Sequence, residues 1–291
     1  MKFNSPVYPL CPSFENGTLE IESTKKYISF LEKKGVKHIM TTAGTSQFNL
    51  LDVEEVRSFN LSMIDFNGNK IIGMPPLSIY NIKKEIDYYN SKNINDASLL
   101  ILFPERYYSN EQLISFFKEI CEMSNYPILV HGNILRRGNG GNYEYDKKLL
   151  SQLSEIDGFI GMKEESSSLE FAKNNLQELD MEIIVAGGSM RRFWSLEPFG
   201  ATSYLTGVGS FNPTIEENFY SEYMNGDIRK AKEIMTSFET PLFDSFMYIG
   251  WHASMRETLH QMGFIKGNRE PFVTLSHDEK NLIKKTLKKI L

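Results

Sequence analysis

The sequence is poor in cysteine and contains no long apolar run. Its 291 residues include 2 cysteines, Cys11 and Cys121, which are too few and too far apart for a disulfide framework or a zinc knuckle. We expect both thiols to be buried among apolar side chains. No stretch approaches the roughly 18 to 20 apolar residues of a membrane span, and the N-terminal segment lacks the apolar region of a signal peptide. We therefore expect a cytoplasmic protein with no membrane partner.

The sequence also lacks a basic stripe. The formal net charge is −5 and the Lys and Arg residues are scattered, so nucleic acid is excluded as an expected partner. No cluster of His, Asp and Glu suggests a metal site, and no strand–Gly-x-Gly-x-x-Gly–helix order suggests a nucleotide site, so we expect neither metal nor cofactor. A composition of 41% hydrophobic and 24% charged residues is that of a globular protein with a full core.

What the sequence does contain is an alternation of short β-branched runs with longer amphipathic stretches. This alternation is typical of βα units around a parallel sheet. The predicted strands are residues 7–11, 36–41, 70–74, 97–103, 127–131, 159–163, 183–186 and 202–206. Eight such units favour an α/β fold of the closed (β/α)8 TIM-barrel type, although periodicity alone leaves an open doubly wound sheet possible.

Helices are predicted between the strands and after them. In residues 21–34 one face carries Ile21, Tyr27, Ile28 and Leu31, and residues 111–123 carry a similar apolar face. After residue 213 the pattern indicates helices at 215–224, 228–238 and 278–291, the last with a lysine run that we expect on a solvated face. We therefore predict a barrel over residues 1–213 and a helical region over 214–291 that packs on it.

Barrel enzymes build their sites at the C-terminal ends of the strands, so reactive side chains there are the first candidates. Lys163 closes the apolar run Phe159-Ile160-Gly161-Met162, where partial desolvation favours an uncharged amine able to attack a ketone. The alternative is a lysine that is solvated or paired with a neighbouring carboxylate such as Glu164 or Glu165. Position alone leaves both interpretations open.

Two other strand ends, and the loop that follows one of them, carry weaker signals. Gly44, Thr45 and Ser46 form a turn whose N–H and hydroxyl groups suit a carboxylate, or an ordinary loop that caps a helix. His131 ends a predicted inner strand and is either an acid–base group or a structural histidine. Arg136, followed by Arg137, lies in a glycine-rich loop that either binds a substrate carboxylate or is a mobile surface loop.

These segments, in this order, resemble the pyruvate-dependent aldolase superfamily that contains dihydrodipicolinate synthase and N-acetylneuraminate lyase. The resemblance runs over nearly the whole chain. Its motifs are Asn16-Gly17, the 41–47 turn, Leu51-Asp52-Val53-Glu54-Glu55, Gly161-Met162-Lys163-Glu164-Glu165-Ser166-Ser167, Ala186-Gly187-Gly188, Phe199-Gly200-Ala201, Asn212-Pro213 and Leu259…Gly263…Arg269-Glu270-Pro271.

The resemblance implies that Lys163 forms a Schiff base with pyruvate or a related 2-keto acid. It also implies that Gly44, Thr45, Ser46 and Gly187 bind the substrate, with Thr45 in a proton relay. Gly44 stands where a first threonine or serine is frequent, and Gln47 replaces a common glutamate.

The match to the family pattern is less complete at the positions of the two family tyrosines and of the substrate-binding arginine. His131 replaces a tyrosine that shuttles protons, and its side chain is shorter and titrates at lower pH. Tyr107 or its neighbour Tyr108 is an approximate match to a second tyrosine that dihydrodipicolinate synthase receives across a subunit interface, and each is alternatively a surface aromatic. Arg136 matches a substrate-binding arginine. The resemblance further implies a homotetramer or homodimer.

Three functions follow from these residues. The first is a metal-free carbon–carbon lyase or synthase of the class I aldolase type, a divergent paralogue of the lysine-pathway enzyme. The second is a dehydratase of a 2-keto-3-deoxy sugar acid that uses the same imine. The third is a barrel that binds a keto acid without catalysis, with Lys163 held in a salt bridge.

Overall fold

The computed structural model describes residues 1–291 apart from 42–43, 76, 103–108, 134–144, 167 and 291. The described residues group into two compact units, each assembled from segments that are distant in the sequence. The first unit comprises Met1–Val7 and Asn69–Leu205, and the second comprises Tyr8–Gly68 and Thr206–Leu291. The predicted boundary between residues 213 and 214 divides the chain differently and stays a prediction.

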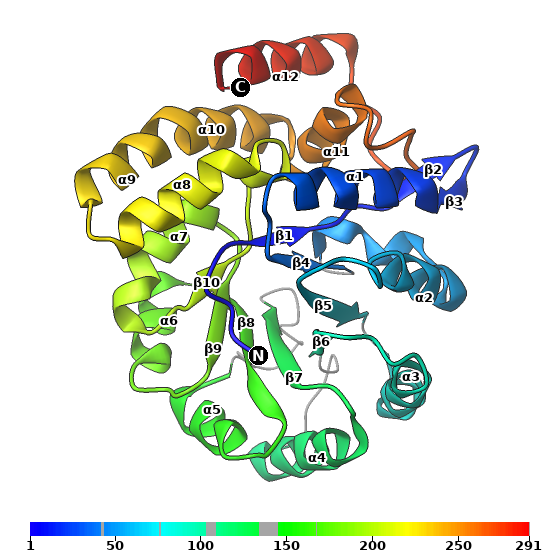
Figure 1. Ribbon diagram of the computed structural model, residues 1–291, viewed down its shortest axis with the longest axis vertical. Helices are drawn as coiled ribbons and strands as arrows, with labels where there is room; N and C mark the ends of the chain where they lie inside the picture. Colours follow the sequence, from blue (N-terminus) through cyan, green and yellow to red (C-terminus); the bar gives the residue numbers. More distant parts are fainter. Residues whose placement is uncertain (42–43, 76, 103–108, 134–144, 167, 291) are drawn as a thin grey trace. The chain divides into compact units, whose positions relative to one another are not determined.

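The first unit contains a parallel sheet whose strands follow one another in chain order (Figure 1). These strands are β5 (Asn69–Met74), β6 (Ala97–Ile101), β7 (Ile128–Asn133), β8 (Phe159–Glu165), β9 (Glu182–Val185) and β10 (Ser203–Tyr204). The N-terminal segment joins the sheet through a parallel bridge between Val7 and Leu205. Apolar residues of these strands, such as Ile72 and Leu100, are fully buried, because the sheet is covered on both faces.

In the described part of the chain, an α-helix lies between each strand of this unit and the next, on the outer side of the sheet (Figure 1). The helices are α3 (Ile79–Asn90), α4 (Asn110–Met123), α5 (Lys147–Ser154), α6 (Leu169–Leu176) and α7 (Ser189–Leu196). Side-chain caps start most of them. Ser109, for example, accepts the N–H of Gln112 at the start of α4. The apolar face predicted for residues 111–123 is buried as expected.

The second unit contains a hairpin, the remaining helices, a short strand and most of strand β1 (Val7–Pro9), whose first residue belongs to the first unit. Strand β1 leads into a bond from the Leu10 N–H to the carbonyl of Met40, the last residue of β4 (His38–Met40). The hairpin of β2 (Ser13–Glu15) and β3 (Thr18–Glu20) turns at Asn16 and Gly17, which have φ angles of 51° and 77°. An Asn-Gly pair is suited to a two-residue turn that needs positive φ at both positions.

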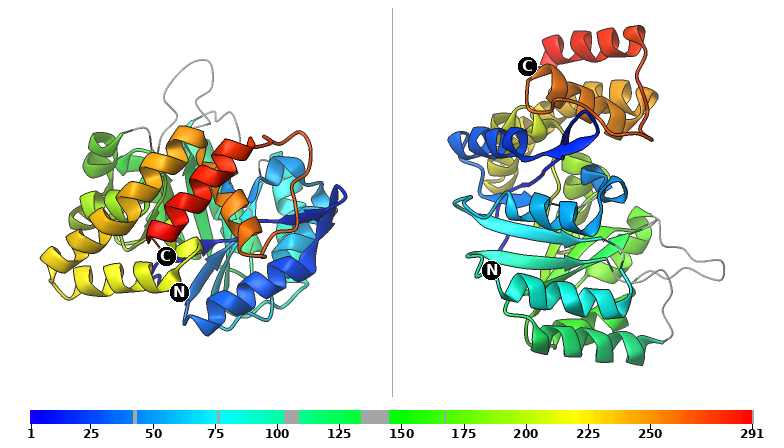
Figure 2. Two further views of the ribbon diagram at one scale, coloured as in Figure 1. Left: turned by 90° about the horizontal axis from the view of Figure 1, so that it is seen from above. Right: turned by 90° about the vertical axis from the view of Figure 1, so that its right-hand side faces the viewer.

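The helices of the second unit include the predicted C-terminal ones. Their bounds are α1 (Ile21–Lys33), α2 (Val53–Leu61), α8 (Pro213–Met224), α9 (Ile228–Ile234), α10 (Thr240–Ile249), α11 (Trp251–Gln261) and α12 (His277–Ile290). A π-helical turn, Met235–Glu239, follows α9 and extends one residue past the predicted segment 228–238. Helices α10 and α12 lie side by side (Figures 1 and 2).

Each of the eight predicted runs contains a strand, so the strand predictions are confirmed within one or two residues at most ends. Lys284, Lys285, Lys288 and Lys289 are exposed on α12, which confirms the solvated lysine face. Cys11 and Cys121 are both free and buried, as expected. Ile21, placed on the buried face of its helix by the periodicity, is only half-buried because it is the first residue of α1. Among the described residues, no helix is long and apolar enough to cross a membrane.

Candidate active site

Lys163 lies near the C-terminal end of β8, and its side chain is 2% exposed. Because side chains alternate along a strand, Lys163 and Glu165 point to one face of β8 and Met162 and Glu164 to the other. Strand β8 pairs in parallel with β7, and the register places His131 opposite Lys163. The structure thus brings together two of the predicted site residues, His131 and Lys163.

Lys163, His131 and Glu165 form a triangle of polar atoms. The Lys163 Nζ lies 2.7 Å from His131 Nε2 and 2.9 Å from Glu165 Oε2. The third side, from His131 Nε2 to Glu165 Oε2, is 2.8 Å. The lysine and histidine side chains are almost completely buried, whereas the Glu165 side chain is 30% exposed. Of these three side chains, the Glu165 carboxylate is therefore the one most exposed to solvent.

The triangle admits two arrangements of its protons. If Lys163 is an ammonium, it donates to Glu165 and to the unprotonated Nε2 of His131. If Lys163 is an uncharged amine, Nε2 carries the proton and donates it toward the amine or the carboxylate, since one imidazole nitrogen cannot donate and accept at once. The two arrangements differ by the transfer of one proton over the 2.7 Å between Nζ and Nε2.

Glu165 is held as an anion. Burial alone raises the pKa of its carboxyl group, but the positive charge of Lys163 and the hydrogen bonds from His131 and Lys163 outweigh burial and hold that pKa well below its usual range. Gly187, after β9, lies beside this carboxylate: a Cβ at that position would be 3.6 Å from Glu165 Cγ. Gly187, predicted to bind substrate, is thus a neighbour of the cluster.

The opposite face of β8 is fixed by a buried ion pair. Glu164, 1% exposed, accepts two hydrogen bonds from Arg192 of α7, at 2.9 Å from Nε and 2.7 Å from Nη2. The Ser166 N–H and hydroxyl also donate to Glu164 Oε1. These contacts hold the end of β8 against α7, and they leave Glu164 unavailable as the partner of Lys163 that the sequence also allowed.

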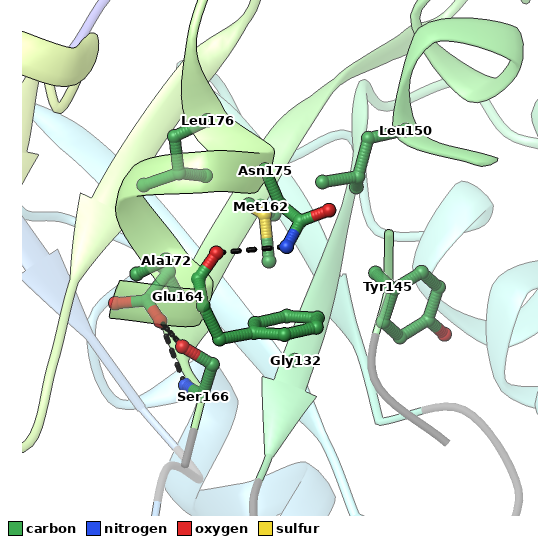
Figure 3. Close-up of a pocket in the computed structure, with 10 residues that line it drawn as sticks. Gly132, Tyr145, Leu150, Met162, Glu164, Ser166, Ala172, Asn175 and Leu176 are labelled. Carbon is green, nitrogen blue, oxygen red and sulfur yellow. Dashed lines mark hydrogen bonds between the residues drawn. The ribbon is translucent and has the colours of Figure 1, made fainter. Parts of the chain in front are cut away.

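A small pocket lies on this opposite face, between the β7–β8 pair and helices α5 and α6 (Figure 3). Met162, Leu150 and Leu176 line it with apolar atoms, and Glu164 and Ser166 line its polar side. Because strand residues alternate, this pocket is separated from Lys163 by the sheet itself. It is therefore not the substrate site that the sequence predicts.

Gly44, Thr45 and Ser46 form a 3-10 turn in the second unit. The Ser46 hydroxyl donates to the carbonyl of Leu10 at 2.6 Å, and the Thr45 carbonyl accepts from the Cys11 thiol at 3.5 Å. Both Thr45 and Ser46 are buried. The turn is thus an anchored loop, but it belongs to the second unit and Lys163 to the first, so a common site remains a prediction.

Gln47 ends this turn in a left-handed conformation, with φ 50°. The residue is 6% exposed, and its Oε1 has no hydrogen-bond partner among the described residues. A non-glycine residue at positive φ with an unsatisfied buried oxygen is unusual and is typical of functional loops.

Arg136 and Tyr107, like Arg137 and Tyr108, lie outside the described residues. The structure adds Glu165 to the site, a residue that the sequence indicated only as an alternative salt-bridge partner of Lys163. Its position two residues after Lys163 in a strand was the signal that places both side chains on one face. In the described part of the chain, no group of three or more His, Cys, Asp and Glu side chains is arranged to hold a metal ion.

The alternating strands and helices, with reactive groups at strand ends, define a (β/α)8 barrel with a C-terminal helical extension, as predicted. Two solved structures share this fold. Dihydrodipicolinate synthase from Thermotoga maritima has a TM-score of 0.85, 20% identity and coverage of 99% of this chain and 98% of its own. A prophage protein of E. coli K12 in complex with pyruvate, from the dihydrodipicolinic acid synthase family, has a TM-score of 0.85, 16% identity and coverage of 99% and 98%.

The chain belongs to the dihydrodipicolinate synthetase family, whose model matches residues 4–290. Among its relatives, 4-hydroxy-tetrahydrodipicolinate synthase of Ligilactobacillus salivarius is 23% identical over 281 residues, which cover 95% of each chain. The synthase of the same name from Archaeoglobus fulgidus is 22% identical over 287 residues, covering 96% of this chain and 95% of its own.

Proposed function

We propose that this protein is a Schiff-base lyase or synthase of the class I aldolase type, which acts on pyruvate or a related 2-keto acid through Lys163. The observation that carries the proposal is the buried Lys163 amine, 2.7 Å from an imidazole nitrogen that can take its proton. Family membership, relatives named as synthases and a similar structure in complex with pyruvate support the same chemistry.

The bond changes of the proposed imine step are balanced without a metal or an external reductant. The uncharged Nζ attacks the C2 carbonyl carbon, and the carbonyl oxygen takes up protons and leaves as water. The product is a protonated imine, which withdraws electrons from the adjacent carbon. Loss of a proton or of an aldehyde from that carbon gives the enamine shared by lyases and synthases.

The substrate carboxylate is assigned to the turn of Gly44, Thr45 and Ser46. The Ser46 hydroxyl already donates to the Leu10 carbonyl. The donors that this turn offers to the substrate carboxylate are therefore its N–H groups and the Thr45 hydroxyl. Gly187 leaves room beside Glu165 for a ligand to approach. Arg136 and Tyr107 complete the proposal as groups for a second carboxylate and for proton transfer.

Reduction with borohydride tests the imine directly. The protein is incubated with pyruvate and with a panel of 2-keto-3-deoxy acids, reduced, and weighed by intact mass spectrometry. We expect a keto-acid adduct that peptide mapping locates on Lys163 and that is lost in Lys163→Ala. A matched control, Lys173→Ala, changes a partly exposed lysine of α6 and keeps the adduct.

The result also separates the alternatives. If no keto acid is trapped, the chain is a binding barrel in which Lys163 serves the ion pair with Glu165, at 2.9 Å. If an adduct forms, product analysis decides between the two enzymes. A lyase releases pyruvate and an aldehyde from the deoxy acid, whereas a dehydratase releases water and leaves the carbon chain intact.

A further inference from the structure

The geometry points to a catalytic role for Glu165: its negative charge stabilises His131 while that imidazole holds the proton that Lys163 must lose and then returns it to the departing oxygen. This inference rests on the proposed function and deepens it. It assigns the proton transfers of imine formation to a histidine–carboxylate pair on two neighbouring strands. Both residues of the pair belong to the first unit.

The contacts favour easy movement of one positive charge. Glu165 Oε2 lies 2.9 Å from Lys163 Nζ and 2.8 Å from His131 Nε2. The carboxylate therefore stabilises an ammonium and an imidazolium almost equally, since Coulomb energy depends on distance. Moving the proton between two nitrogen atoms 2.7 Å apart leaves the total charge of the cluster unchanged. Burial of the cluster therefore adds little to the free-energy cost of the transfer.

The backbone of β8 holds this arrangement. On one side, the register pairs His131 with Lys163 and Asn133 with Glu165. On the other, the carbonyl of Glu164 accepts the Ala186 N–H at 2.8 Å, and the Glu164 side chain is bound by Arg192. The backbone is thus fixed at Glu164, and the Glu165 carboxylate is itself bound by Lys163 and His131, so little order must be created when substrate arrives.

The protons balance over the whole step. Lys163 starts as an ammonium and gives one proton to His131 as Nζ bonds to C2. A proton then passes from the new ammonium-like nitrogen to the carbonyl oxygen. His131 finally gives its stored proton to that hydroxyl, which leaves as water. The net change converts an ammonium and a ketone into a protonated imine and water, with Glu165 an anion throughout.

Glu165→Gln tests the role because it preserves the shape and removes the charge. The rate of pyruvate adduct formation on Lys163 is measured by timed borohydride quenching between pH 5 and 9. We expect the rate at neutral pH to fall by about 10- to 100-fold, within the range of acid–base contributions, while an adduct still forms at long times. The acid limb of the rate profile is also expected to move, because the carboxylate no longer stabilises the imidazolium.

Two further variants complete the design. Glu165→Asp keeps the charge on a shorter side chain, and we expect a slower rate with the wild-type shape of pH profile; it decides the matter if Glu165→Gln fails to fold. Glu170→Gln, on the exposed first turn of α6, is expected to match the wild type. Unchanged rates and profiles in folded variants at position 165 overturn the role of Glu165 alone. Absence of any adduct in the wild type overturns the proposed function instead.

Discussion

Three ionisable side chains meet on one face of β7 and β8, and their chemistry depends on each being close to the other two. A lysine buried without a partner is costly, and a single carboxylate at 2.9 Å explains how Lys163 is retained there. The same contact fits a structural salt bridge. What distinguishes a reactive site is His131, since an imidazole in contact with the amine offers a place for its proton.

Arg192 supplies a test of how the end of β8 is held. Replacing it with methionine leaves the Glu164 carboxylate buried without its guanidinium, and breaking such a pair costs about 3 kcal/mol. We expect a loss of this size in the free energy of unfolding, measured by urea denaturation. Arg229→Met, at an exposed position of α9, is the control. For the double variant Glu164→Leu with Arg192→Met, we expect the loss in the free energy of unfolding to be smaller than the sum of the losses in the two single variants. A double-variant loss equal to that sum contradicts a buried ion pair as the origin of the effect.

His38 gives a pH dependence at the residue scale. Burial, with the nearby charge of Lys37, lowers the pKa of its imidazole from 6.5 to about 4. The unfolded chain therefore binds more protons between these values, and the free energy of unfolding falls as the pH drops from 6.5 to 4. The pKa difference corresponds to roughly 3 kcal/mol.

His38→Gln removes this titration, so its stability is expected to decline less over the same window than that of the wild type. Thermal or urea unfolding at half-unit pH steps provides the measurement. His277→Gln, at the exposed start of α12, controls for loss of a histidine. Parallel pH curves for the wild type and His38→Gln would show that the buried imidazole does not control acid stability.

At the scale of elements, helix α2 is the place where two motifs that are distant in the sequence, residues 51–55 and 269–271, come into contact. Asp52 and Glu55 form a capping box at the start of α2. Arg269 donates to the Glu55 carboxylate and to the Leu50 carbonyl, and its guanidinium lies 4.5 Å from the centre of the Phe14 ring. The sequence contained both motifs, but only the fold reveals that they are in contact.

Asp52→Ala removes the side-chain acceptor that caps α2. We expect a loss of about 1 kcal/mol in the free energy of unfolding, the usual cost of an N-cap, without a change in the pyruvate adduct. Asp65→Ala, an exposed residue after α2, is the matched control. A loss several times larger would mean that the cap also maintains the Glu55–Arg269 pair.

At the scale of the whole molecule, the chain is a (β/α)8 barrel of the dihydrodipicolinate synthetase family. The resemblance implies a homotetramer or homodimer. We expect light scattering on the purified protein to give two or four times the mass of one chain. The mass of a single chain at micromolar concentration contradicts this prediction.

The sequence by itself determined the order of strands and helices, because each strand is a short apolar run and each helix has an apolar face that recurs with the helical period. It also determined which residues stand at strand ends, and so singled out Lys163 and His131. Only the tertiary structure decided that Glu165, rather than Glu164, is the partner of Lys163. Alternation puts Glu165 on the face of Lys163 only because β8 continues to residue 165, two residues past the predicted end of the strand. The binding of Glu164 by Arg192 of α7 depends on tertiary packing, which local periodicity does not encode.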